Sequence, residues 1–95
     1  MTRVKICGIT SAEDAAAAAA AGADALGFVF VPGTPRLISP DAAARIVEGL
    51  PPFVTPVGVF VDQPLEEVLR IAAGCNLQAV QLTGMSPGIS VAASP

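Results

Sequence analysis

Four polar side chains stand at the ends of apolar, β-branched runs or in the loops that follow them: Cys7, Arg36, Asp62 and Thr83. A thiol at such a position could take a proton or attack a carbon, and a guanidinium could hold an anion. In parallel α/β folds, ligands bind at the carboxyl ends of the strands, on the loops that lead to the helices. The pattern therefore predicts that the four side chains lie on one rim of a parallel sheet.

Cys7 is the residue best suited to chemistry. A helix start signal follows three residues later, and Lys5 points to the same side of the strand because side chains alternate along it. The amino end of a helix and a nearby lysine both favour a thiolate, which could act as a base or as a nucleophile. The alternative is a small buried hydrophobe, the usual role of a free cysteine. Cys75 follows Gly74 at the opposite rim and is predicted to be structural.

The other side chains each have a simpler alternative. Arg36 is the only charge in the loop 32–38, and its guanidinium suits a carboxylate or a phosphate, but it could equally be a solvated loop charge. Asp62 could cap the helix that follows it or complement the helix dipole. Thr83 could be a polar strand end without a role. Together with Lys5, Asp62 and Thr83 are candidate rim contacts.

One unit repeats along the chain, an apolar strand followed by a helix and a glycine. We predict strands at 3–7, 25–31, 55–61 and 78–82. The continuous apolar strands and the helices between them are typical of a parallel α/β sheet covered on both faces. Residues 1–84 form this unit, whereas residues 85–95 show no period and are predicted to be an irregular tail.

The helix boundaries follow from capping residues and glycines. The first helix is predicted to begin at a capping box with Thr10 at the cap and to end before Gly22. The second begins at Ser39-Pro40-Asp41 and ends at Gly49. The third begins at Asp62-Gln63-Pro64 and ends at Gly74.

Composition excludes several classes of function. The 95 residues are 53% hydrophobic and 14% charged, which excludes intrinsic disorder. The net charge is -3 and the five basic residues are scattered, so nucleic-acid binding is not predicted. Histidine is absent, which excludes a Ser-His-Asp triad, and two cysteines alone cannot make a zinc site. No glycine-rich dinucleotide motif or Walker lysine motif is present.

No feature of the sequence predicts export or insertion into a membrane. The apolar runs are shorter than the roughly 20 residues of a membrane span. The amino terminus leads directly into a strand pattern and lacks the regions of a signal peptide. We therefore expect a cytoplasmic protein without a disulfide.

Residues 4–10, with the sequence VKICGIT, resemble the opening strand of the phosphoribosylanthranilate isomerase family of tryptophan biosynthesis. Three further stretches agree in order and spacing: GADALGFVF at 22–30, Pro35-Arg36 with ISP at 38–40, and VGVFV at 57–61. The stretch LQAVQLTG at 77–84 resembles the family's fourth strand. The resemblance covers residues 3 to about 84, and the KICGIT stretch is its most specific part.

The resemblance implies the N-terminal half of a (β/α)8 barrel, with four strands and three helices. It implies an Amadori rearrangement, in which N-(5-phosphoribosyl)anthranilate becomes its 1-deoxyribulose phosphate ketose without a metal or cofactor. Cys7 would be the general base that takes the sugar C2 proton, and Arg36 would bind the substrate, through its anthranilate carboxylate. The partner would be this phosphosugar, with no nucleic acid and no membrane. The alternatives are a catalytically inactive half-barrel and a related phosphosugar isomerase.

Two departures from the family pattern carry expectations of their own. The family usually has His where this chain has Thr83. A complete barrel needs about 200 residues or more, and the family's general acid and phosphate site belong to later strands. We therefore expect an incomplete chain that is inactive alone and self-associates through the exposed edges of its first and fourth strands.

Overall fold

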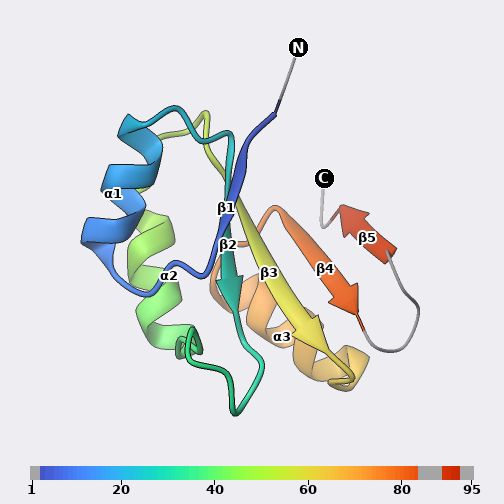
Figure 1. Cartoon of the computed structure of the whole chain (residues 1–95). Coiled ribbons are helices and arrows are strands. Elements are labelled where there is room, and N and C mark those ends of the chain that lie inside the picture. The colour runs from blue at the N-terminus through green and yellow to red at the C-terminus, as the bar shows by residue number, and fades with distance from the viewer. Residues whose placement is uncertain (1–2, 84–88, 93–95) are drawn as a thin grey trace.

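The computed structural model describes residues 3–83 and 89–92. Strands and helices alternate along the chain up to the last strand (Figure 1). The elements are β1 Lys5–Cys7, α1 Ala12–Ala20, β2 Ala25–Val29, α2 Pro40–Glu48, β3 Thr55–Val61, α3 Leu65–Gly74, β4 Ala79–Thr83 and β5 Ile89–Ala92. They form one sheet in the order β1-β2-β3-β4-β5, in which β1 to β4 are parallel and β5 is antiparallel to β4. The parallel α/β fold predicted from the sequence is confirmed.

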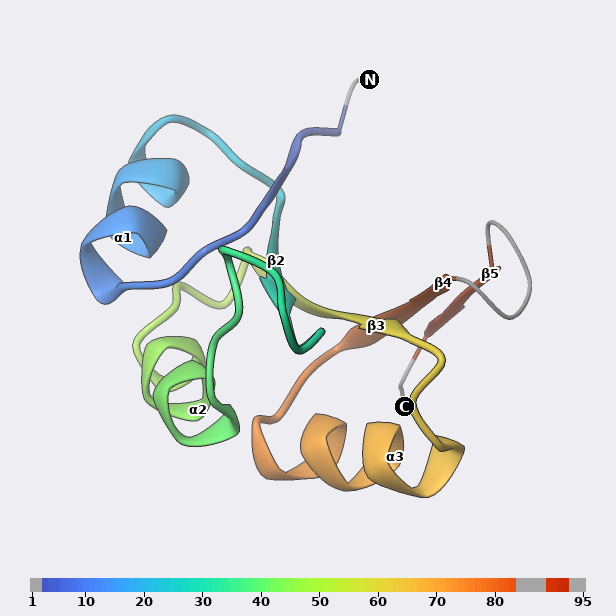
Figure 2. The same ribbon diagram turned by 60° about the horizontal axis from the view of Figure 1, so that its bottom comes forward.

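The three helices lie on one side of the sheet (Figure 2). The opposite face carries Lys5 and Cys7, which are exposed, so the expectation of a sheet covered on both faces is wrong for the described residues. Strand side chains alternate between faces, so every second residue turns toward the helices. The open face is therefore the one on which the candidate base lies.

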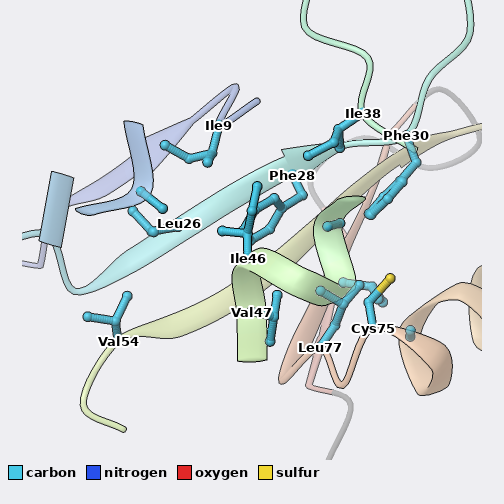
Figure 3. Close-up of a cluster of buried hydrophobic side chains, with 14 of the residues drawn as sticks. Ile9, Leu26, Phe28, Phe30, Ile38, Ile46, Val47, Val54, Cys75 and Leu77 are labelled. Atoms are coloured by element: carbon cyan, nitrogen blue, oxygen red, sulfur yellow. The ribbon is translucent and has the colours of Figure 1, made fainter. Parts of the chain in front are cut away.

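The core fills the space between the sheet and the helices (Figure 3). Leu26 and Phe28 on β2 and Phe60 on β3 are fully buried, and Ile46 on α2 packs with them. The rings of Phe30 and Phe60 stack with their centroids 5.3 Å apart. Burying such side chains stabilises the fold by roughly 1.5–3 kcal/mol each, so the large side chains of Leu26, Phe28 and Phe60 hold the helices against this face of the sheet.

The predicted element boundaries are confirmed in part. The range of β3 and the start of α2 agree with prediction, and Ser39 Oγ accepts a hydrogen bond from the Ala42 N–H at 3.2 Å. The first helix is capped one residue later than predicted, because Ser11 Oγ, not Thr10, accepts the Asp14 N–H at 3.0 Å. The third helix ends at Gly74 as predicted, and the left-handed residue after it is Asn76, with φ +58°.

The predicted irregular tail is wrong for Ile89–Ala92, which form β5 and pair with β4. Residues 84–88 and 93–95 lie outside the described part of the chain. Because β5 covers β4, the expectation of an exposed edge on the fourth strand is also wrong. Among the described strands, β1 remains an edge, since it pairs with β2 alone.

Of the helices that the structure describes, none is long and apolar enough to cross a lipid bilayer.

Candidate functional site

The carboxyl ends of the parallel strands meet at one rim, as the sequence predicted (Figure 1). Cys7 is the last residue of β1, and Thr83 is the last residue of β4, opposite Val61 on β3. Asp62 follows β3 directly, and Arg36 lies in the loop after β2. The side chain of Thr83 lies outside the described part of the structure, so its predicted contact stays untested.

The loop after β2 folds back along the strand and brings Arg36 to the rim. Thr34 donates its hydroxyl to the Val31 carbonyl at 2.8 Å, which closes a turn. Leu37 then pairs with Val29, and the Ile38 N–H donates to the Val29 carbonyl at 3.1 Å. These hydrogen bonds hold the loop beside the end of β2 and fix the position of its backbone.

Cys7 and Arg36 meet around Gly8. Arg36 Nη1 donates to the Gly8 carbonyl at 3.2 Å, and the side chain of Arg36 packs across the glycine. Gly8 has φ +85°, a conformation that glycine adopts without strain. Cys7, Gly8 and Arg36 border one hollow of about 400 Å³ between the end of β1 and α1. The rest of its lining is Ile6, Ile9, Asp14, Ala17, Ala18 and Ala21. The two residues that the sequence favoured for chemistry are therefore brought together.

The thiol of Cys7 is exposed on the open face of the sheet. The interpretation of Cys7 as a buried hydrophobe is therefore wrong for this structure. Gly27, its partner in the register of β1 and β2, lies beside it. The carbonyl of Gly27 accepts two hydrogen bonds, from the Gly8 N–H at 3.0 Å and the Ile9 N–H at 3.1 Å. The turn that follows Cys7 is thus tied to β2.

Lys5 lies on the same open face, and its ammonium donates to Gln81 Oε1 at 2.5 Å. This hydrogen bond joins β1 to β4 across the two strands between them. Lys5 was predicted from the sequence as a rim contact, whereas Gln81 was not. The signal was a polar residue within an otherwise apolar strand, at a position that alternates with Val80 and Leu82, which face the helices.

The capping interpretation of Asp62 is wrong. The residue at the amino end of α3 is Pro64, and no side chain makes a capping hydrogen bond there. Asp62 is exposed and adopts φ +55°, a left-handed conformation in which Asp is enriched. Among the described residues, Asp62 makes no hydrogen bond with Cys7 or Arg36 and does not line their hollow, so its rim role stays a prediction.

Gln63, which was not predicted as a functional residue, joins the ends of β2 and β3. Its Nε2 donates to the Phe30 carbonyl at 2.7 Å, and its Oε1 accepts the Val61 N–H at 2.6 Å. These bonds satisfy backbone groups that the strands leave free as they diverge. The residue therefore stabilises the rim on which the candidate site lies.

Cys75 is buried with 2% of its surface exposed, and its thiol donates to the Pro40 carbonyl at 3.2 Å. Its structural role, predicted from the sequence, is confirmed. Burial raises the pKa of the Cys75 thiol, and the nearby carboxylate of Asp41 raises it further. Cys75 belongs to the core cluster, in which Figure 3 shows it next to Leu77.

We expect Cys75 to make the fold sensitive to alkaline pH. Because its pKa is raised by folding, the folded state keeps a proton that the unfolded chain releases. The free energy of unfolding should be unaffected below the ordinary thiol pKa and fall as pH rises through it, by at most about 1.4 kcal/mol per pH unit. Urea unfolding across this range should show a smaller fall for Cys75→Ala. Equal falls in both proteins would contradict the expectation.

Among residues 3–83 and 89–92, no group of three or more His, Cys, Asp and Glu side chains is arranged to hold a metal ion. The candidate site therefore consists of a thiol, a guanidinium and the glycine backbone between them.

Comparison with known proteins gives consistent matches. A sequence model of the family described as N-(5'phosphoribosyl)anthranilate (PRA) isomerase matches residues 4–92. The N-(5'-phosphoribosyl)anthranilate isomerase of Geobacter sp. (strain M21) is 62% identical over 84 residues, which cover 88% of this chain and 41% of the relative. The chain spans about two fifths of the length of the curated relatives it matches.

Solved structures agree with the sequence matches. The phosphoribosyl anthranilate isomerase of Thermotoga maritima superposes with a TM-score of 0.88 at 55% identity, covering 92% of this chain and 42% of that one. A second structure of such an isomerase, in complex with reduced 1-(o-carboxyphenylamino)-1-deoxyribulose 5-phosphate, also gives a TM-score of 0.88 at 55% identity and covers 92% and 45%. The four parallel strands and three helices thus form half of a (β/α)8 barrel.

Proposed function

Because this chain belongs to the N-(5'-phosphoribosyl)anthranilate isomerase family, we propose that it supplies the base and a substrate-binding cation for the Amadori rearrangement of phosphoribosylanthranilate. The observation that carries the proposal is the meeting of Cys7 and Arg36 around Gly8 at the strand-end rim. The rearrangement needs a base that removes the C2 proton, and a cation that binds the anthranilate carboxylate would hold the substrate next to that base.

In the proposed step, the ring oxygen of the ribosylamine takes a proton and the C1–O bond breaks, which leaves an iminium at C1. The thiolate of Cys7 then removes the C2 proton, and the C2–H electron pair forms the C1=C2 bond of an enolamine. Tautomerisation to the C2 ketone places a proton on C1. The exposed thiol at the end of β1 supports this role, since a substrate on the open face can reach it.

Arg36 is proposed to bind the anthranilate carboxylate. Its Nη1 donates to the Gly8 carbonyl at 3.2 Å, which fixes the direction of the guanidinium. A guanidinium has five N–H donors, so others remain for a carboxylate. The carboxyphenyl group in the ligand of the second solved structure is the kind of anion that this interaction would accept.

The proposal also covers three further rim residues, the substrate class, the cellular location and self-association. Lys5, Asp62 and Thr83 are proposed to face the substrate from the rim, with Gln81 orienting Lys5 through their hydrogen bond. The substrate class is a small phosphosugar, and a cytoplasmic location follows from the biosynthetic family. The unpaired edge of β1 is proposed to allow self-association.

We expect Arg36→Lys to weaken substrate binding with little change in the chemical step. Lysine keeps the charge but loses the planar fork that matches a carboxylate. The Michaelis constant for phosphoribosylanthranilate should rise about tenfold, as expected for the loss of one charged hydrogen bond. Activity should be measured in a complete barrel, made by joining residues 1–83 to the remaining part of the Geobacter relative.

The matched control is Arg45→Lys, because Arg45 is an exposed arginine on α2. It should leave the Michaelis constant unchanged. An unchanged Michaelis constant for Arg36→Lys as well would return Arg36 to the role of a solvated loop charge.

A further inference from the structure

Gly27 lies opposite Cys7 in the register of β1 and β2, at a distance that leaves no room for a side chain. A Cβ atom built on Gly27 would lie 2.8 Å from the Cys7 sulfur, 3.2 Å from its Cα and 3.3 Å from its Cβ. Carbon and sulfur atoms that are not bonded do not approach to 2.8 Å without a shift of one of them. The Cys7 thiol therefore occupies space that any other residue at position 27 would fill.

Backbone conformation does not explain this glycine. Gly8, Gly22 and Gly33 have positive φ angles, whereas Gly27 does not. A glycine within a strand costs stability, because it loses more chain entropy on folding and packs no side chain. The close approach of Cys7 is thus the observation that accounts for a glycine at this position.

Gly58 on β3 shows what a glycine of the core does in the same sheet. A Cβ there would lie 2.6 Å from Leu77 Cδ1 and 2.8 Å from Phe60 Cε2, both on the side of the helices. Gly58 therefore makes room for core packing, and Gly27 makes room for a thiol on the open face. A comparison of substitutions at Gly27 and at Gly58 therefore separates an effect on the Cys7 thiol from an effect on stability.

We propose that Gly27 is a positioning residue that fixes the place of the Cys7 thiol. Its missing side chain lets the sulfur lie against β2, and its carbonyl accepts the N–H groups of Gly8 and Ile9 that follow Cys7. Both interactions hold the end of β1 in register with β2. The inference rests on the proposed function only because that function makes Cys7 the base. The position of the thiol can be tested without measuring activity.

The consequence is a displacement of the thiol in Gly27→Ala. Because the Cys7 side chain is exposed, it can rotate to another staggered conformation, away from β2 and toward solvent. This rotation relieves the contact at 2.8 Å, whereas the contacts with Cys7 Cα and Cβ at 3.2 and 3.3 Å require β1 to shift by a few tenths of an ångström. The fold can survive a shift of this size while the sulfur moves farther. A displacement of about 1 Å is enough to lower an enzymatic rate about a hundredfold.

The test is site-resolved alkylation of the folded 95-residue chain by iodoacetamide over a range of pH, at concentrations where the chain sediments as a monomer. Mass spectrometry of the peptides gives separate rates for Cys7 and Cys75. In Gly27→Ala, the Cys7 rate should rise about fivefold while the Cys75 rate stays low. In Gly58→Ala, the Cys7 rate should stay within about twofold of the parent. Because Cys75 is buried, its alkylation reports unfolding and serves as an internal control.

A second measurement covers the case in which Gly27→Ala unfolds. Cys7→Ala removes the closest contact, so the loss of urea midpoint caused by Gly27→Ala should be reduced by about half in a Cys7→Ala background. Gly58→Ala should cause the same loss in both backgrounds. Equal losses for Gly27→Ala in both backgrounds, or a Cys7 alkylation rate that matches the Gly58→Ala control, would overturn the inference.

The outcomes also separate this inference from the proposed function. A changed Cys7 alkylation rate in Gly27→Ala, together with near-normal turnover of a Cys7→Ser barrel, would leave the positioning role intact and remove the catalytic one. An unchanged Cys7 alkylation rate in Gly27→Ala, together with a large loss of turnover in a Cys7→Ser barrel, would leave Cys7 as the base and remove Gly27 as the residue that positions it.

Discussion

Replacing Cys7 by serine is expected to remove nearly all isomerase activity from a complete barrel that contains residues 1–83 of this chain. A hydroxyl is a much weaker base than a thiolate and is almost fully protonated at neutral pH. General base catalysis contributes about 10²–10⁴-fold to such rates, so kcat should fall by a factor in this range. The conversion of phosphoribosylanthranilate, followed in steady state, gives the value.

The control for this substitution is Cys75→Ser, because Cys75 is the chain's other cysteine and lies buried against Pro40. It should change stability at most and leave kcat within about twofold. A Cys7→Ser barrel with near-normal kcat would remove the assignment of Cys7 as the base.

The second large effect concerns the 95-residue polypeptide by itself, which we expect to show no turnover above the buffer rate. The family resemblance places the general acid and the phosphate site on later strands, outside residues 1–95. Without them the C1–O bond has no proton donor and the substrate is not held in place, and positioning alone can contribute roughly 7–11 kcal/mol to a barrier. The complete barrel should be active under the same conditions.

The same polypeptide should associate at high concentration through β1, one of the two edge strands of the described sheet. Such an edge offers unpaired backbone groups to a second copy, and sedimentation at several concentrations would detect the association. Turnover comparable to that of the complete barrel, from a well-behaved monomer, would contradict both expectations.

The order of the elements could be predicted because local signals and the global fold agree in this chain. An apolar run predicted the range of β3, and capping residues predicted the start of α2 at Ser39-Pro40. Both predictions are confirmed by the structure. The rim placement of Cys7 and Arg36 followed from the rule that ligand loops lie at strand carboxyl ends. Their meeting around Gly8 depends on the course of the loop after β2, which tertiary hydrogen bonds fix.

Other features could not be predicted from local sequence. Ser11 rather than Thr10 caps α1, because both hydroxyl residues suit the position and the course of the chain decides between them. Gln63 and Gln81 act through partners 33 and 76 residues away. Ile89–Ala92 pair antiparallel with β4, which no period in so short a run could indicate.

The role of Gly27 was hidden for a different reason. A glycine within an apolar strand can mark a close approach of another group, but only the register that places Gly27 opposite Cys7 shows which group it accommodates. The same register places Gly27 and Val57 in one row across the sheet. Space on the open face is therefore a property of the assembled sheet and not of any one strand.

The most direct test of the account is the relation between alkylation of Cys7 and loss of activity in the complete barrel. Iodoacetamide is added stepwise, and each sample is assayed for turnover and for the alkylated fraction of Cys7 and Cys75. Activity should fall in proportion to the alkylated fraction of Cys7 and reach zero at complete modification. Reduced 1-(o-carboxyphenylamino)-1-deoxyribulose 5-phosphate should protect Cys7 from the reagent. A barrel that keeps its turnover with Cys7 fully alkylated would contradict the central claim that this thiol is the catalytic base.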